Sequence, residues 1–460
     1  MHSKVAPEEL VIESGDSLQK NLPAFFVSKV LLIGAAFLSA ITLAFFLENL
    51  LIYWAIFLLV VFFSCALKIN SQIVFAFALW VFLPTEYITQ NPLQGYLNPS
   101  SAIFLIFLLR TRTVPTRADS LYLLVFAVFL VMATLASSDL QRSSAWSLQT
   151  LLLVYGLSCL GKLSKQLSRE SVFLGIALVT YSVCGLAFAE LLTSSSLVYD
   201  GRFLPTFWES WRWQNYSIYR VTTTIGHPLA NGLFFSSAAL LLFRQATQAK
   251  LRFFYFGSAL LSTFAVFLSG SRSAILGLVA GLSIWLILEW RRIGSSTKAW
   301  LLLLAPTSLL IFVQSELFDR IFVRIGSGEG ISSQTYREDL LLWAGYFSSN
   351  FFLTGSGPGV SGDLWLSYGN LNPLENGFMQ LWVSLGLVPT ILISLATVIF
   401  IYRQTRIRPS VAVSCIPSFI YLPLTNFVDA SSSYLIFIAM MVVLSSANSQ
   451  YPMKNHDGSV

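Results

Sequence analysis

Long apolar runs recur along the chain from residue 25 to residue 447. A helix that crosses a bilayer needs roughly 17–25 mostly apolar residues, and the bilayer requires its backbone groups to bond internally. The 460 residues are 55% hydrophobic and only 11% charged, with a mean hydropathy of +0.70, which leaves too little polar surface to coat several soluble cores. The sequence therefore predicts an all-α, polytopic integral membrane protein.

The runs predict about fourteen transmembrane helices, and the alternative is twelve spans plus a re-entrant pair, because the runs near 71–110 and 410–447 are short or contain proline. The predicted spans are 25–47, 51–67, 71–86, 97–110, 119–136, 145–161, 171–192, 228–243, 253–269, 273–290, 299–313, 377–402, 410–428 and 432–447. The expected divisions are a cytoplasmic tail 1–22, N-terminal helices 23–192, a core 193–402, C-terminal helices 403–447 and a cytoplasmic tail 448–460. No removable signal peptide is expected, because no short apolar core with a cleavage site follows the mixed charges of the first 22 residues.

The distribution of lysine and arginine predicts the orientation of the chain. Five connectors with three basic residues each fall on one side of a fourteen-span arrangement: 110–118, 162–170, 244–252, 291–298 and 403–408. With the tails, that side holds 20 of the 28 basic residues and is predicted to be cytoplasmic, as are both termini. The predicted external side holds arginine and no lysine: Arg142, Arg202, Arg212, Arg220, Arg272, Arg320, Arg324 and Arg337. The two larger external loops, 193–227 and 314–376, are expected to contain short amphipathic helices, one of them over about 336–349.

Four polar stretches lie at the predicted external ends of spans, and we expect them to form one site: 220–232, 270–274, 335–359 and 372–389. Because a guanidinium binds phosphate or carboxylate with two parallel hydrogen bonds, the arginines of these stretches are candidates for an anion site: Arg220, Arg272 and Arg337. His227 and Glu375 are candidates for moving a proton. Glycines at positions 226, 355, 357 and 359 would permit close approach of the backbone.

Each of these residues also has a purely structural interpretation. His227 precedes a proline and suits a helix cap, and Arg272 suits a contact with lipid headgroups. Arg337 has acidic neighbours in its own predicted helix, and Glu375 suits the first turn of a helix. Neither a disulfide framework nor a metal site is indicated, because the four cysteines lie in apolar runs and the three histidines lie far apart.

The order of these stretches resembles the O-antigen ligase and O-antigen or exopolysaccharide polymerase family of integral membrane glycosyltransferases. The matching features are an arginine before a glycine, proline and asparagine segment (Arg220 to Asn231), the S-G-S-R turn at 269–272, and an arginine before an aromatic helix and a glycine turn (Arg337 to 355–359). The last feature is the pair Glu375-Asn376, followed after nine residues by Gly386. Glu375 stands where ligases of this family have histidine, which favours a polymerase, and Pro389 departs from the usual final residue of the motif.

The resemblance implies transfer of a glycan from a polyprenyl diphosphate donor to a sugar hydroxyl at the external face of the cytoplasmic membrane. In that reaction Glu375 would be the base, with His227 as the second candidate, and Arg220, Arg272, Arg337 and Asn376 would bind the diphosphate and the glycan. Neither a metal nor a cofactor is expected. The implied partners are the lipid-linked donor and acceptor, membrane lipids and a chain-length regulator, but not nucleic acid.

Three other functions stay open. The first is ligation of a finished glycan to a lipid A core. The second is a flippase or transporter of lipid-linked oligosaccharides, which would require ionisable residues deep inside spans, whereas nearly all charges here lie at span ends. The third is a scaffold without catalytic activity.

Overall fold

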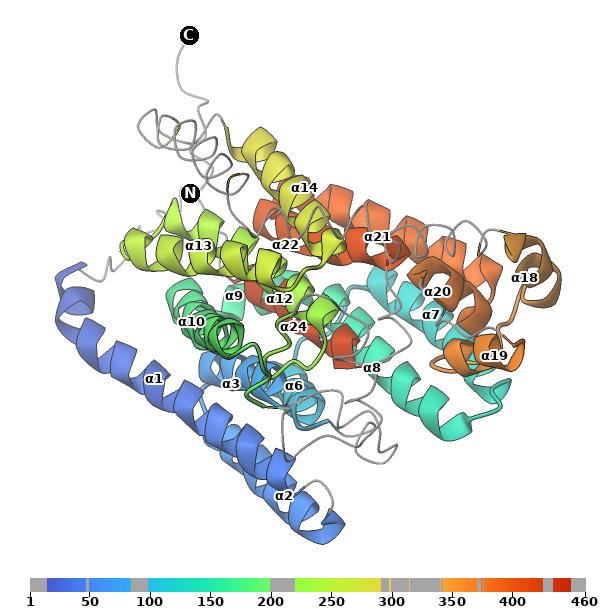
Figure 1. The fold of residues 1–460 in the computed structure, drawn as a ribbon, viewed down its shortest axis with the longest axis horizontal. Helices are drawn as coiled ribbons and strands as arrows, with labels where there is room; N and C mark the ends of the chain where they lie inside the picture. Colours follow the sequence, from blue (N-terminus) through green and yellow to red (C-terminus); the bar gives the residue numbers. More distant parts are fainter. Residues whose placement is uncertain are drawn as a thin grey trace, which may run out of the picture.

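The computed structural model describes residues 15–46, 49–83, 98–198, 220–290, 298, 314, 340, 342–369, 374, 376–424 and 433–447. All regular elements in this part of the chain are helices, as predicted, and they pack into a bundle (Figure 1). In chain order they are α1 (Gly15–Phe45), α2 (Leu50–Ala66), α3 (Ile69–Phe82), α6 (Pro99–Arg110), α7 (Arg117–Leu135), α8 (Leu140–Ser158), α9 (Leu160–Gln166), α10 (Arg169–Thr193), α12 (Pro228–Ala246), α13 (Arg252–Leu268), α14 (Arg272–Glu289), α18 (Ala344–Asn350), α19 (Ser361–Ser367), α20 (Gly377–Leu385), α21 (Leu387–Ile407), α22 (Pro409–Tyr421), the 3₁₀ turn η1 (Leu422–Leu424) and α24 (Ser433–Ser445).

The helices follow the predicted spans closely, with two exceptions. The expected span 377–402 is two helices, α20 and α21, that meet at Gly386, whose φ of +104° cannot continue a helix. The expected span 145–161 continues into α9 after a bend of 71°. The span predicted at 299–313 lies outside the described residues, as do residues 199–219 of the first external loop and 315–339 of the second.

Three described segments are long and apolar enough to cross a membrane: Ala24–Phe45, Arg169–Thr193 and Leu387–Ile407. The bent pair α8 and α9 meets the same test when taken as one span, and a further eight apolar helices have 10–17 residues. Exposed leucine and phenylalanine on α1 and α2, such as Leu38 of α1 and Phe62 of α2, provide an apolar surface suited to lipid. The chain is thus a membrane protein, and the number of about fourteen spans stays a prediction.

The centre of the bundle is formed by α3, α12 and α24, whose side chains are almost all buried. Their aromatic rings stack on one another: Phe77 of α3 lies 6.1 Å from Phe234 of α12 and 6.3 Å from Phe437 of α24, measured between ring centroids. Trp80 stacks on Phe437 at 4.5 Å. These apolar contacts on all sides explain why the three helices show no polar face.

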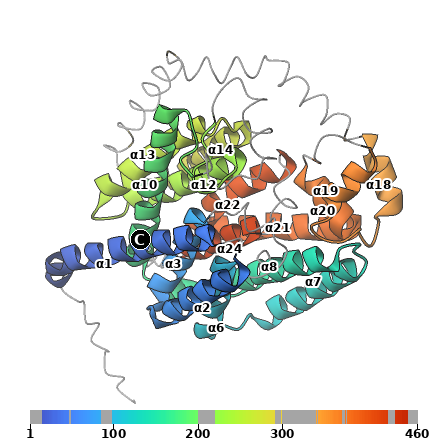
Figure 2. The same ribbon diagram turned by 60° about the horizontal axis from the view of Figure 1, so that its bottom comes forward.

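A second, smaller core lies at one end of the bundle, where α18, α19 and α20 pack together (Figures 1 and 2). We call these three helices the end cap. Phe347, Trp365 and Met379 form its centre, one residue from each helix. α18 is the described part of the amphipathic helix predicted over 336–349, and residues 335–339 lie outside the described residues.

Four of the five basic connectors lie together. The bonds between them are Lys162 Nζ to Val114 O (2.7 Å), Arg408 Nη2 to Ser164 Oγ (3.3 Å) and Arg169 Nε to Gln245 Oε1 (2.7 Å). This grouping of the connectors is what the predicted orientation requires.

Candidate active site

Two of the four predicted polar stretches lie side by side. The backbone N–H of Val221 donates to Leu268 O (3.3 Å), and Arg220 Nε donates to Ser269 O (2.9 Å). The Arg220 side chain therefore lies along the turn that joins α13 to α14, and Arg272 is the first residue of α14. We call residues 220–232 and 269–274 the arginine group.

Close helix packing holds this turn in place. Ser271 accepts a hydrogen bond from the backbone N–H of Ala274 (3.2 Å), which caps α14, and its hydroxyl lies 2.9 Å from the hydroxyl of Tyr421 on α22. Gly232 of α12 faces the same place, where a Cβ atom would lie 2.6 Å from the Tyr421 hydroxyl and 2.7 Å from Ala274 Cβ. Only glycine permits α12, α14 and α22 to meet here.

A buried polar network shapes the turn before α12. Asn231 accepts a hydrogen bond from the Thr223 hydroxyl (2.6 Å), and its amide nitrogen donates to the carbonyls of Thr222 and His227. Thr223 has a φ of +45°, a left-handed conformation that is costly for a β-branched residue. The turn is therefore held by side chains rather than by its intrinsic preference.

His227 caps α12, because its Nδ1 accepts the backbone N–H of Leu229 (3.1 Å). A nitrogen that accepts this bond carries no proton, so a proton-transfer role for His227 would have to use Nε2. The side chain is half-buried at the start of α12. The structural and the catalytic interpretation of this residue are thus compatible.

Two residues of the arginine group's surroundings were not recognised from the sequence. Glu190, near the end of α10, is fully buried and accepts the backbone N–H groups of Thr222 (2.9 Å) and Thr223 (3.1 Å). Tyr421 is buried beside the arginine group, with its hydroxyl 2.9 Å from that of Ser271. The available signal for Glu190 was a carboxylate inside a predicted apolar span.

The other two polar stretches also lie side by side. The backbone N–H groups of Ser356 and Gly357 donate to Val383 O (2.7 Å) and Ser384 O (3.1 Å), and that of Leu387 donates to Phe351 O (2.9 Å). We call residues 351–359 and 376–388 the glycine group. Its backbone bonds surround the break between α20 and α21.

The glycines of this group leave room for neighbouring segments of the protein itself. A Cβ atom at Gly355 would lie 2.2 Å from the carbonyl carbon and oxygen of Ser384, and one at Gly357 would lie 2.3 Å from Ser137 Cβ. Gly357 also has a φ of +111°. The close approach predicted for these glycines is therefore an approach of α20 and of the α7–α8 loop.

Asn376 caps α20, with its Oδ1 accepting the backbone N–H groups of Phe378 (3.0 Å) and Met379 (3.1 Å). A contact of Asn376 with substrate would therefore have to use its Nδ2. Glu375 and Arg337 lie outside the described residues, and their predicted roles stay predictions. α20 contacts η1, the turn that directly follows Tyr421, so the arginine and glycine groups share the α22–η1 joint.

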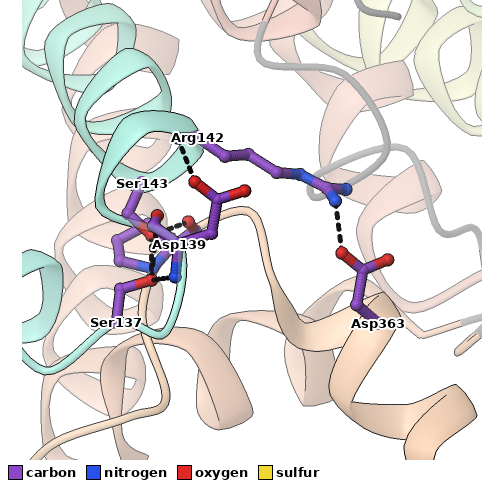
Figure 3. Close-up of polar contacts among 6 residues, drawn as sticks. Ser137, Asp139, Arg142, Ser143 and Asp363 are labelled. Atoms are coloured by element: carbon purple, nitrogen blue, oxygen red, sulfur yellow. Dashed lines mark hydrogen bonds and ion pairs between the residues drawn. The ribbon is translucent and has the colours of Figure 1, made fainter.

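The first turn of α8 contacts both the glycine group and the end cap (Figure 3). Ser143 donates to Pro358 O (2.7 Å), and Arg142 forms an ion pair with Asp363 of α19 at 2.6 Å. Arg142 belongs to the predicted external arginines, and the structure pairs it with a carboxylate of the end cap.

Aromatic side chains on the end cap are partly exposed. Trp343 stacks on Tyr368 with a centroid distance of 5.9 Å, and Tyr346 donates to the Tyr368 hydroxyl (3.1 Å). Among the described residues, no group of three or more histidine, cysteine, aspartate and glutamate side chains is arranged to hold a metal ion.

The apolar helical bundle is typical of a polytopic membrane protein. The arginine group and the glycine group form a candidate polar site between its helix ends. Residues 257–394 match the family model described as O-antigen ligase. The match supports the family predicted from the sequence, the O-antigen ligase and polymerase family, and an enzymatic role. It contains the S-G-S-R turn and the glycine group, whereas Arg220, His227 and Glu190 precede it. The chain matches none of the curated proteins and none of the solved structures.

Proposed function

We propose that this protein is a polysaccharide polymerase, which transfers a glycan from a polyprenyl diphosphate donor to a sugar hydroxyl of a lipid-linked acceptor. The reaction takes place at the external face of the cytoplasmic membrane, with both termini of the chain in the cytoplasm. The observation that carries the proposal is the contact between Arg220 and the turn that ends at Arg272. A guanidinium held against this turn, with a second arginine as the first residue of the helix that follows, suits a diphosphate at the membrane surface.

The arginines act on the leaving group. Cleavage of the bond between the anomeric carbon and the diphosphate oxygen leaves the electron pair on that oxygen, and fixed cations stabilise the new charge. Because Arg220 Nε already donates to Ser269 O, phosphate would be bound by its two terminal nitrogens. Arg337 is proposed as the third cation.

The acceptor hydroxyl attacks the anomeric carbon and gives its proton to a base. Glu375 is the proposed base, because it directly precedes the Asn376 cap of α20, and His227 is the second candidate. Direct displacement inverts the anomeric configuration. The chemistry needs no metal in this scheme.

The second candidate function is ligation of a finished glycan to a lipid A core, and the description of the matched family favours it. Glu375, which stands where the ligases of the resemblance have histidine, favours the polymerase. A chain-length regulator is a proposed protein partner for the polymerase alone.

Purified protein in lipid vesicles, supplied with a polyprenyl-diphosphate-linked repeat unit with or without lipid A core, distinguishes these functions. The proposal predicts chain growth without the core and in the presence of a chelator. Transfer to the core alone would establish a ligase. Movement of the donor across the bilayer without a new glycosidic bond would establish a flippase, and the absence of all three would contradict the enzymatic role.

A further inference from the structure

Glu190 is a fully buried carboxylate in the last turn of the apolar helix α10. The carboxyl end of a helix carries partial negative charge, and burial removes the water that would solvate a carboxylate. Both effects disfavour glutamate at this position. Its presence therefore has to be offset by specific hydrogen bonds.

Those bonds lead to the arginine group. Glu190 Oε2 accepts the backbone N–H groups of Thr222 (2.9 Å) and Thr223 (3.1 Å), and Oε1 accepts the hydroxyl of Ser196 (3.3 Å). Thr222 lies two residues after Arg220, and Thr223 lies four residues before His227. A single side chain thus holds the backbone between two candidate site residues.

The turn depends on this support. Thr223 has a φ of +45°, which a β-branched residue adopts only when its surroundings impose it. The backbone of Val221 bonds to α13, and the Arg220 side chain bonds to the turn before α14. A shift of residues 222 and 223 would therefore move Arg220 away from the turn that carries Arg272.

We infer that Glu190 is a positioning residue of the proposed glycosyl-transfer site, which keeps Arg220 beside Arg272 through the reach of its acceptor oxygens rather than through its charge. The inference rests on the proposed function, in which the two arginines bind the diphosphate. Glu190 itself touches no substrate in this scheme. Its contribution is to preserve the spacing of the two guanidinium groups.

Two conservative variants separate reach from charge. Glu190→Gln keeps the length of the side chain and a carbonyl oxygen for both N–H groups, and Ser196 can turn its hydroxyl to accept from the new amide. Glu190→Asp keeps the charge but withdraws the oxygens by one methylene group. Thr180→Val, a buried change elsewhere on α10, controls for general damage to this helix.

The measurement is the affinity of the purified full-length protein for polyprenyl diphosphate without a glycan, together with polymer formation and the melting temperature. We expect Gln to bind within about twofold of wild type and Asp to bind about tenfold more weakly, because the lost bonds are buried. Thr180→Val should bind as wild type. A purely structural role would lower the melting temperature of Asp without changing the affinity of the folded fraction.

Weaker binding by Gln than by Asp would overturn the inference in favour of charge, and equal binding by both variants would overturn it altogether. If Asp is not recovered in folded form, Gln alone decides, because weak binding by folded Gln contradicts a role through reach and wild-type binding supports it. Wild-type protein that binds no diphosphate lipid would instead refute the proposed function, and the inference with it.

Discussion

The arginine group and the glycine group meet at the same joint but are held together by different means. In the arginine group, the backbone of a turn is bonded by buried side chains, Asn231 within the group and Glu190 from the neighbouring helix α10. In the glycine group, backbone bonds backbone across positions where a side chain would not fit, such as Gly355. The structure of the arginine group is therefore sensitive to the loss of a polar side chain. The structure of the glycine group is sensitive to the gain of a single carbon atom.

The largest effect is expected on polymer formation when the proposed base, Glu375, is changed. Glu375→Gln keeps the shape of the side chain and removes the proton acceptor, so polymer formation should fall by about 10²–10⁴-fold. The measurement is turnover at matched abundance in the membrane. Asn376 provides the cap of α20 in both proteins, so the stability of the helix should change little.

Near-normal turnover of the Gln variant would assign the base to the arginine group instead. His227→Ala should then be the inactivating change. Because His227 Nδ1 caps α12, a melting curve has to show that the alanine variant is folded.

The next effect tests the backbone contact of the glycine group. Gly355→Ala introduces a Cβ atom 2.2 Å from the Ser384 carbonyl, which should lower the free energy of unfolding by about 3 kcal/mol or more. Gly362→Ala is the matched control, because a Cβ atom there meets no atom within 4 Å. Thermal melting of both variants in detergent checks this, and equal stability of the two would refute the contact.

A somewhat smaller effect is expected in the arginine group. Asn231→Ala removes the side-chain partner of Thr222 O and of the Thr223 hydroxyl, which should cost about 2 kcal/mol of stability. Ser237→Ala on the same helix is the control, because no described residue bonds its buried hydroxyl. The difference between their melting temperatures is the measurement, and the polar network would lose its assigned role if the two variants melted together.

The smallest effect concerns the ion pair that joins the first turn of α8 to the end cap. The side chains of Arg142 and Asp363 are 39% and 65% exposed, so Asp363→Asn should cost at most about 1 kcal/mol. Added salt should reduce the difference from wild type further. A much larger loss of stability or activity would show that the pair belongs to the site.

The helices could be predicted because the length and apolarity of a span are local properties. The contact of Arg220 with the Ser269 turn was also expected, since both stretches lie at predicted ends of spans on one side. The break at Gly386 was missed, because it depends on the approach of Leu353, whose carbonyl oxygen would lie 2.8 Å from a Cβ atom there. No local sequence pattern predicts such a contact between segments that lie far apart in the chain.

Glu190 was missed for the same reason. A glutamate at the end of an apolar run is usually an interfacial residue, and its partners Thr222 and Thr223 lie about thirty residues later. Tyr421 lies inside an apolar run, and only the packing of α22 against α14 brings its hydroxyl to Ser271. The order of the motifs predicts a location for the site, but no local pattern indicates the side chains that support the turns found there.

In the proposed function, the two parallel hydrogen bonds of an arginine fork, and not positive charge alone, bind the diphosphate of the donor. The most direct test is the rate of polymer formation by Arg272→Lys at matched abundance in the membrane, with Arg337→Lys measured beside it. We expect the rate of polymer formation to fall by about 10²-fold in Arg272→Lys, because lysine keeps the charge but cannot make two parallel hydrogen bonds. Normal polymer from both lysine variants would contradict the account and leave these arginines as anchors for lipid headgroups.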